Sequence, residues 1–241
     1  EEMEPCDCCQ PDVEIANNGD LYIGYRNNIS NQRKHYIVSK TFGNDDFNEP
    51  VPISSVSDEV SYCPGSGPSL SIENNVIASG FYVSQQNNSY LNYADLGSLA
   101  FTSEVNVNPG STFQQNYPVV LLHESVIHSV WIDYRDGNPD IYFAAMELGA
   151  SEVTNEQKVN DSIEDFVHKD PFLMWGYENL YSFWSDNRTG DYQIYMASTG
   201  IANIESITVT NSQGWNLVGL PVEVENNSAI TLYLESIEGT L

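Results

Sequence analysis

The sequence predicts an all-β fold built from four similar repeats. A proline followed by a short apolar strand recurs, at intervals of roughly 50 residues, at Pro11, Pro68, Pro118 and Pro171. Each copy continues with a polar turn, a second apolar strand, a polar hairpin and a third strand, and helical periodicity of any length is hard to find. This pattern is typical of a β-propeller, because such repeats bury their apolar faces only by packing side by side.

The strands and turns of each copy can be predicted from its own sequence. After the first, proline-linked strand, the second and third strands are expected at 21–25 and 36–40, 76–83 and 90–94, 126–131 and 141–145, and 180–184 and 194–198. Asn18-Gly19 between the first two strands of copy one is a strong hairpin signal, since glycine tolerates the positive φ of a tight turn. More polar fourth strands are expected at 50–54, 105–108, 157–160 and 206–210. The fold class is therefore a β-propeller with four visible four-stranded blades.

Large aromatic residues end the second strand of every copy. Burial of roughly 150–250 Å² by each such ring favours a role in packing between blades, and the residues concerned are Tyr25, Phe81, Trp131 and Trp184.

The chain divides at about residue 212. Residues 1–212 form the predicted propeller, whereas Gly214-Trp215-Asn216 opens a stretch of different character. This stretch resembles the start of a β-rich module found near the C-termini of large exported bacterial proteins. Residues 213–241 are expected to begin such a module, so that the chain is a piece of something longer, or else to supply a closing strand or a fifth blade.

Charge excludes several classes of partner. The formal net charge is −26 and the isoelectric point is near 4.1, which argues against nucleic acid, whose phosphates require Lys and Arg. The same charge disfavours an anionic membrane surface, and no segment is apolar enough to insert into a bilayer. The start at Glu1-Glu2-Met3 looks like an end exposed by processing.

Cysteine usage indicates export. Three cysteines, Cys6, Cys8 and Cys9, lie together, and Cys63 stands alone before the second copy. An even number in a Lys-poor chain suggests two disulfides in a secreted protein, with one member of the trio bridged to Cys63. Two alternatives remain open: the four sulfurs are a thiolate site for Zn²⁺ or Cu⁺, or they are free thiols.

Several motifs resemble one family. The run Pro5-Cys-Asp-Cys-Cys-Gln-Pro11, the stretch 19–28, and residues 63–68 resemble the start of secreted bacterial sialidase-like propellers. The hairpins at 131–142 and 184–195 resemble the group's Trp-x-Asp-x-Arg-x-Gly-x-x-Asp-Ile-Tyr pattern. Members often have His after the Cys-Pro pair, where this chain has Gly65. The resemblance implies a propeller and secretion, and it implies an enzyme only through shared fold.

The arginines fit a structural role better than the chemistry of a sialidase. A sialidase needs three arginines around its substrate's carboxylate, and this chain has four in all, of which Arg135 and Arg188 occupy equivalent hairpins. Each is expected to form an exposed pair with a neighbour, Asp133 or Asp186, and to stiffen its turn. Neither a Gly-x-Ser-x-Gly elbow nor a His-Glu-x-x-His motif is present, and His168 has no recognisable partner. No catalytic residue is therefore assigned.

One hairpin offers oxygen ligands for a cation. Asp136, Asn138 and Asp140 alternate in a tight loop, which is the spacing that calcium favours. The alternative is an ordinary Asp/Asn/Gly hairpin. Calcium is the only cofactor that this pattern suggests.

The function expected from these observations is that of a secreted, non-catalytic binding or structural module. Tyrosine and tryptophan beside Asn and Asp suit recognition of a surface glycan or a protein, or assembly with other copies of the chain. The first alternative is a glycoside hydrolase of sialidase-like type, with Asp12 or Glu14 of the innermost strand as catalytic carboxylates in a central channel. The second alternative is a thiolate metal-binding protein using the four cysteines.

Overall fold

The computed structural model describes residues 4–161, 166–199 and 204–209, and almost all of their regular structure is β-strand. Four antiparallel sheets follow one another along the chain, which confirms the all-β expectation. The single helical turn in the described part is the 3₁₀ turn η1 (Ser84–Gln86). None of the described helical structure could cross a bilayer.

Each sheet is one blade, and its strands are ordered as in the sequence. Blade 1 contains β1 (Asp12–Ile15), β2 (Leu21–Ile29), β3 (Gln32–Lys40), β4 (Val51–Pro52) and an additional β5 (Asp58–Glu59) paired with β3. Blade 2 contains β6 (Ser69–Glu73), β7 (Val76–Val83), β8 (Asn88–Asp95) and β9 (Val105–Asn106). Blade 3 contains β10 (Gln115–His123), β11 (Val126–Asp133), β12 (Asp140–Glu147) and β13 (Thr154–Lys158). Blade 4 contains β14 (His168–Gly176), β15 (Asn179–Asp186), β16 (Gln193–Thr199) and β17 (Ile204–Val209).

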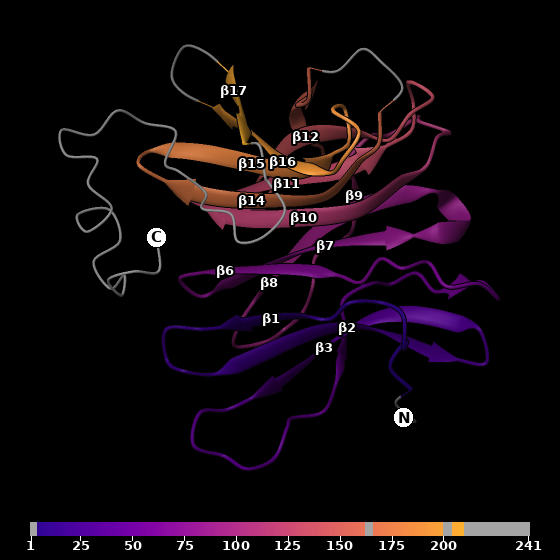
Figure 1. Cartoon of the computed structure of the whole chain (residues 1–241). Coiled ribbons are helices and arrows are strands. Elements are labelled where there is room, and N and C mark those ends of the chain that lie inside the picture. The colour runs from indigo at the N-terminus through magenta and orange to yellow at the C-terminus, as the bar shows by residue number, and fades with distance from the viewer. Residues whose placement is uncertain (1–3, 162–165, 200–203, 210–241) are drawn as a thin grey trace, which may run out of the picture.

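The blades stack face to face in chain order. The first strands β1, β6, β10 and β14 contact one another in succession and are therefore the inner strands of the blades. In Figure 1, blade 1 lies at the bottom of the stack and blade 4 at the top, with blades 2 and 3 between them. The described residues thus form an open arc of four propeller blades.

Three apolar cores, one at each junction between consecutive blades, hold the arc together. Phe81, Trp131 and Trp184 are almost fully buried, and each packs onto the preceding blade, which confirms their predicted role. Tyr25 differs: its side chain lies on the face of blade 1 that points away from blade 2 and stacks on Tyr36 of the same sheet, with 6.1 Å between ring centroids.

The predicted fourth strands exist in every blade, although the one in blade 3 begins three residues earlier than expected. The expectation of a separate module, closing strand or fifth blade at 213–241 concerns residues outside the described part of the chain.

Candidate functional site

The four recurring prolines meet at one end of the arc. Pro11 and Pro68 immediately precede β1 and β6, whereas Pro118 and Pro171 lie within β10 and β14. The inner strands lie next to one another, so their leading ends, each marked by its proline, lie together at one end of the arc, which we call the mouth. Proline is tolerated there because an inner strand is the edge of its sheet and needs no ladder N–H.

Two of these prolines sit in β-bulges that redirect the preceding side chain. The pairing register shifts between Asn116 and Val119 in β10, and at the equivalent place in β14. Tyr117 and Asp170 there have φ of 51° and 54°. A left-handed backbone at a non-glycine residue costs about 1–3 kcal/mol and persists where the surrounding structure fixes it, as a β-bulge does here. The Tyr117 residue is 39% exposed and the Asp170 side chain 69% exposed.

Loops before blades 1 and 2 close around this mouth. The backbone of Gly65 lies against the hydroxyl of Tyr117, and Gly67 lies against the carbonyl of Gln10, so closely that a Cβ at either glycine would clash. Gly65 also has φ of 69°, which favours glycine. Backbone packing therefore explains glycine at position 67, and the positive φ explains glycine at position 65.

Two carboxylates lie on the same face of the inner strand of blade 1. Asp12 and Glu14 are paired with Gly24 and Tyr22 of β2, and both side chains point to the face that packs toward blade 2. Alternate residues of a strand are about 6.6–6.8 Å apart, so the two sequence-predicted carboxylates are neighbours on the face of blade 1 that packs toward blade 2.

Asp12 has an architectural role. Its Oδ2 accepts the backbone N–H of Leu70 at 2.7 Å and so links β1 to β6. Ser69, which follows Pro68 as Asp12 follows Pro11, accepts the N–H of Val120 at 3.2 Å in the same way. The residue after the repeated proline thus links each of the first two inner strands to the next.

Glu14 has no such partner among the described residues. Burial, and secondarily the charge of Asp12, raise the pKa of Glu14 to about 7. A carboxyl group that keeps its proton near neutral pH is able to donate it to a leaving group, as the general acid of a glycosidase does. Glu14 is therefore the strongest candidate for acid catalysis on this face.

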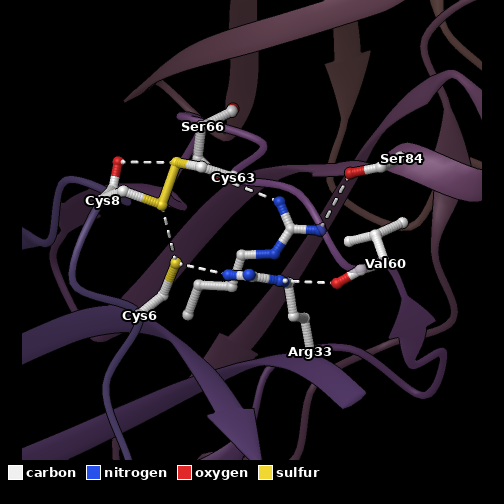
Figure 2. Close-up of a disulfide and its surroundings, with 8 residues drawn as sticks. Cys6, Cys8, Arg33, Val60, Cys63, Ser66 and Ser84 are labelled. Atoms are coloured by element: carbon white, nitrogen blue, oxygen red, sulfur yellow. Dashed lines mark hydrogen bonds between the residues drawn. A yellow bond between two sulfur atoms is a disulfide. The ribbon is translucent and has the colours of Figure 1, made fainter. Parts of the chain in front are cut away.

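A cluster of cysteines and arginines lies at the same end of blades 1 and 2 (Figure 2). Cys8 and Cys63 form a disulfide, with 6.2 Å between their Cα atoms, and join the segment before β1 to the loop before β6. The expected bridge from the trio to Cys63 is confirmed. The expected second disulfide is not formed, because Cys6 and Cys9 are free thiols that are both buried.

Two buried arginines accompany the sulfurs. Arg26 forms an ion pair with the buried Asp58 and donates to Ser84 Oγ at 3.2 Å, which connects blade 1 to η1. Arg33 Nη1 donates to Cys6 Sγ at 2.8 Å and Arg33 Nε to the carbonyl of Val60 at 3.4 Å. Sequence reasoning missed both arginines, since nothing local marks them as buried.

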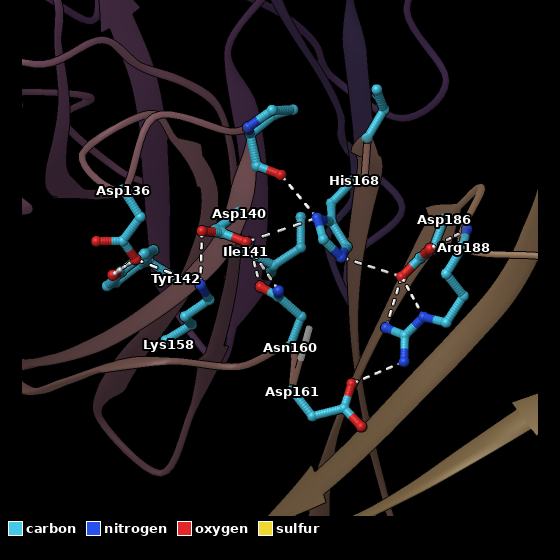
Figure 3. Close-up of polar contacts among 12 residues, drawn as sticks. Asp136, Asp140, Ile141, Tyr142, Lys158, Asn160, Asp161, His168, Asp186 and Arg188 are labelled. Atoms are coloured by element: carbon cyan, nitrogen blue, oxygen red, sulfur yellow. Dashed lines mark hydrogen bonds and ion pairs between the residues drawn. The ribbon is translucent and has the colours of Figure 1, made fainter. Parts of the chain in front are cut away.

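A second polar cluster joins blades 3 and 4 (Figure 3). The buried His168 ring lies between two carboxylates, with Nε2 3.0 Å from Asp186 Oδ2 and Nδ1 3.6 Å from Asp140 Oδ1. Asp186 also accepts hydrogen bonds from Arg188 at 2.6 and 2.8 Å. Burial alone would raise the pKa of Asp186, but the bonds from Arg188 outweigh it and lower that pKa.

The pairs Asp133–Arg135 and Asp186–Arg188 are both formed, as predicted from the repeated hairpins. The expectation that they would be exposed is wrong, since both carboxylates are fully buried. Each guanidinium stacks on a tyrosine of the third strand, at 3.9 and 4.0 Å from the ring centroid. The repeated side chains are therefore part of the blade scaffold.

Two of the three predicted calcium ligands, Asp136 and Asp140, already form ion pairs with Lys158. Lys158 Nζ lies 2.6 Å from Asp140 Oδ2 and 3.3 Å from Asp136 Oδ2, and Asn160 donates to Asp140 at 2.9 Å. A calcium ion bound by Asp136, Asn138 and Asp140 would have to displace this ammonium. The calcium site stays a prediction.

A polar cavity of about 280 Å³ lies at the other end of blades 1 and 2. Its walls come from the turn before β2, the β3–β4 connection and the β8–β9 connection, and they include Asp20, Lys40, Asn48 and Ser98. It is separate from the mouth formed by the proline-linked segments.

Comparison with known proteins supports the fold. No family model matches the sequence, and no curated protein matches it. Among solved structures, an α-L-arabinofuranosidase of family GH93 from Fusarium graminearum is similar with a TM-score of 0.57 at 11% identity, covering 94% of this chain and 76% of that one. A PL25 ulvan lyase has a TM-score of 0.62 at 11% identity over 83% of this chain and 55% of its own.

A third similar structure is the catalytic domain of a GH62 α-L-arabinofuranosidase from Coprinopsis cinerea, with a TM-score of 0.53 at 11% identity over 84% of this chain and 68% of that one. At this level of identity the likeness establishes the β-propeller fold and nothing about chemistry. The sialidase-like resemblance remains a prediction from the sequence.

Proposed function

We propose that this chain is a secreted carbohydrate-active β-propeller of the glycoside hydrolase kind, with Glu14 as the proton donor. The observation that carries the proposal is the half-buried Glu14 on the inner strand, next to Asp12, with its pKa raised to about 7. A hydrolase acting on an acetal needs one carboxyl group that is protonated at working pH and a second carboxylate nearby. The similar arabinofuranosidases and ulvan lyase also support a carbohydrate substrate.

The proposed substrate path runs over the mouth formed by the proline-linked segments. The exposed Tyr117 provides an aromatic surface against which a sugar ring can stack, and Asp170 provides hydrogen-bond acceptors for its hydroxyls. Secretion fits this assignment, because polysaccharides are extracellular and a disulfide persists in an oxidising compartment.

Incubation with arabinan and ulvan tests the proposal, with release of reducing ends as the measurement. We expect cleavage that declines as pH rises through about 7, because the acid form of Glu14 is then lost. Glu14→Gln should lower kcat by about 10²–10⁴-fold while polysaccharide binding is retained. Cleavage by Glu14→Gln at the native rate would exclude Glu14 as the acid.

A second candidate is glycan binding without cleavage. It is favoured by the hydrogen bond that commits Asp12 to Leu70, which leaves Glu14 without a free second carboxylate. Binding of both polysaccharides, measured by affinity electrophoresis, with no cleavage product would support this function. Tyr117→Ala should then weaken binding, whereas Asn48→Ala in the cavity at the opposite end should leave it unchanged.

A further inference from the structure

Three sulfur atoms converge beside the first blade. The Sγ atoms of Cys6, Cys8 and Cys9 all lie within 4.8 Å of one another. Because Cys8 is bonded to Cys63, the two sulfurs able to act as thiolates are those of Cys6 and Cys9. These two are spaced Cys-x₂-Cys, and a metal about 2.3 Å from each sulfur spans about 4.6 Å, close to the 4.8 Å limit on the separation of these sulfurs.

Arg33 places a buried positive charge beside Cys6. Arg33 is buried and, among the described residues, has no carboxylate partner; its hydrogen bonds go to Cys6 Sγ and the Val60 carbonyl. A buried guanidinium requires a compensating negative charge. The neighbouring Arg26 has its own counter-charge, because it forms an ion pair with the buried Asp58.

The charge of the metal-bound state favours a monovalent ion. With both sulfurs bound as thiolates, the buried Arg33 guanidinium and one monovalent cation balance the two negative charges and leave the buried group neutral. A divalent cation at the same two sulfurs would leave one uncompensated positive charge in a buried place.

We propose that Cys6 and Cys9 form a binding site for one Cu(I) ion, with Arg33 as the residue that balances the charge. Cu(I) is soft, monovalent and selected by thiolates. Zn²⁺ instead requires four ligands in structural sites, and the Cys8–Cys63 disulfide withholds two of the four sulfurs. Binding forms two Cu–S bonds in place of the S–H bonds of the free thiols, whose protons pass to solvent, with no change in the oxidation state of sulfur or copper.

The Cys8–Cys63 disulfide makes the proposed site selective for Cu(I) over Zn²⁺. Cys8 Sγ lies 3.4 Å from Cys6 Sγ and forms one wall of the cluster. If the disulfide were reduced, four thiols would be gathered in one place, which is the donor set of a structural zinc site. The oxidised protein is therefore expected to take Cu(I), and the reduced protein to take Zn²⁺ as well.

Anaerobic titration with tetrakis(acetonitrile)Cu(I), in competition with bicinchoninate, tests the proposal on the full chain. We expect one Cu(I) per chain, with the Cys8–Cys63 disulfide still intact in peptide maps. Cys9→Ser should lose this binding by about 100-fold or more, and the double variant Cys8→Ser/Cys63→Ser should retain it. Arg33→Gln should weaken binding by about tenfold, and Arg33→Lys should restore it.

Three outcomes would overturn the assignment. The first is Cu(I) uptake by Cys9→Ser equal to that of the native protein. The second is a Cys6–Cys9 disulfide in the protein as purified, which leaves no thiolates. The third is binding of Zn²⁺ by the oxidised protein as tight as that of Cu(I). Far-ultraviolet circular dichroism of each variant checks that a lost signal reflects the site and not unfolding.

Discussion

Replacing Glu14 by Gln should stabilise the protein at alkaline pH and leave it unchanged at acid pH. Below pH 4.5 the carboxyl group is protonated in both the folded and the unfolded chain. Between pH 4.5 and about 7 the unfolded chain loses this proton while the folded chain keeps it. The folded state then binds more protons, so the free energy of unfolding falls as pH rises through this window and levels off above it.

The size of the effect follows from the shift. The change from 4.5 to about 7 in the pKa of Glu14 corresponds to about 3 kcal/mol at about 1.4 kcal/mol per pKa unit. Partial exposure screens this value, so we expect about 1–2 kcal/mol in practice. Glutamine mimics the protonated acid in size and polarity and has no charge to desolvate, so the variant should not show the fall.

Urea denaturation followed by circular dichroism at pH 4.5, 6 and 8 measures this difference. Glu152→Gln is the matched control, because Glu152 is exposed and its replacement removes the same charge from the surface. If the native protein and Glu14→Gln show the same change in unfolding free energy from pH 4.5 to pH 8, Glu14 is not perturbed. Its assignment as a general acid would then lose its physical basis.

Three further predictions concern stability. Cys8→Ser/Cys63→Ser opens a loop with a sequence separation of 55 and should lower the free energy of unfolding by about 4 kcal/mol in urea titrations, mainly because the unfolded chain gains entropy. Trp184→Ala should cost about 3–5 kcal/mol in the same assay, because this ring is 1% exposed and fills the junction between blades 3 and 4. Addition of calcium should leave the Tm of the native protein unchanged but raise that of Lys158→Ala, where the two aspartates lose the ammonium between them.

A different result would contradict each of these three predictions. An unchanged urea midpoint for the double serine variant would mean that the bridge constrains nothing in the unfolded chain. Trp175, which is 36% exposed, is the matched tryptophan, and an equal loss at Trp175→Ala would remove the distinction between junction and surface. A rise in the native Tm with calcium would show that the ion displaces Lys158.

The apolar cores explain why the sequence predicts the blades but not the packing partner of every repeated aromatic residue. The position that ends each second strand carries Phe81, Trp131 or Trp184, and each ring covers the blade before it. Tyr25 occupies the same position in blade 1, which is the first blade of the described residues, and it stacks within its own sheet. A repeated aromatic residue thus indicates packing between blades. Which surface the ring covers depends on the arrangement of the blades in space.

Local patterning by itself determined the strands, the turns, the four blades and the Asp–Arg hairpins, because each depends on residues close in sequence or on a repeat. It indicated a bridge from the cysteine trio to Cys63, but only the structure decided that Cys8 forms it. Tertiary structure decided the rest. The pairing of Arg33 with Cys6, the placement of His168 between two aspartates, and the raised pKa of Glu14 arise where neighbouring strands and blades exclude water. The strength of a charge interaction depends on that exclusion, and only packing in three dimensions produces it.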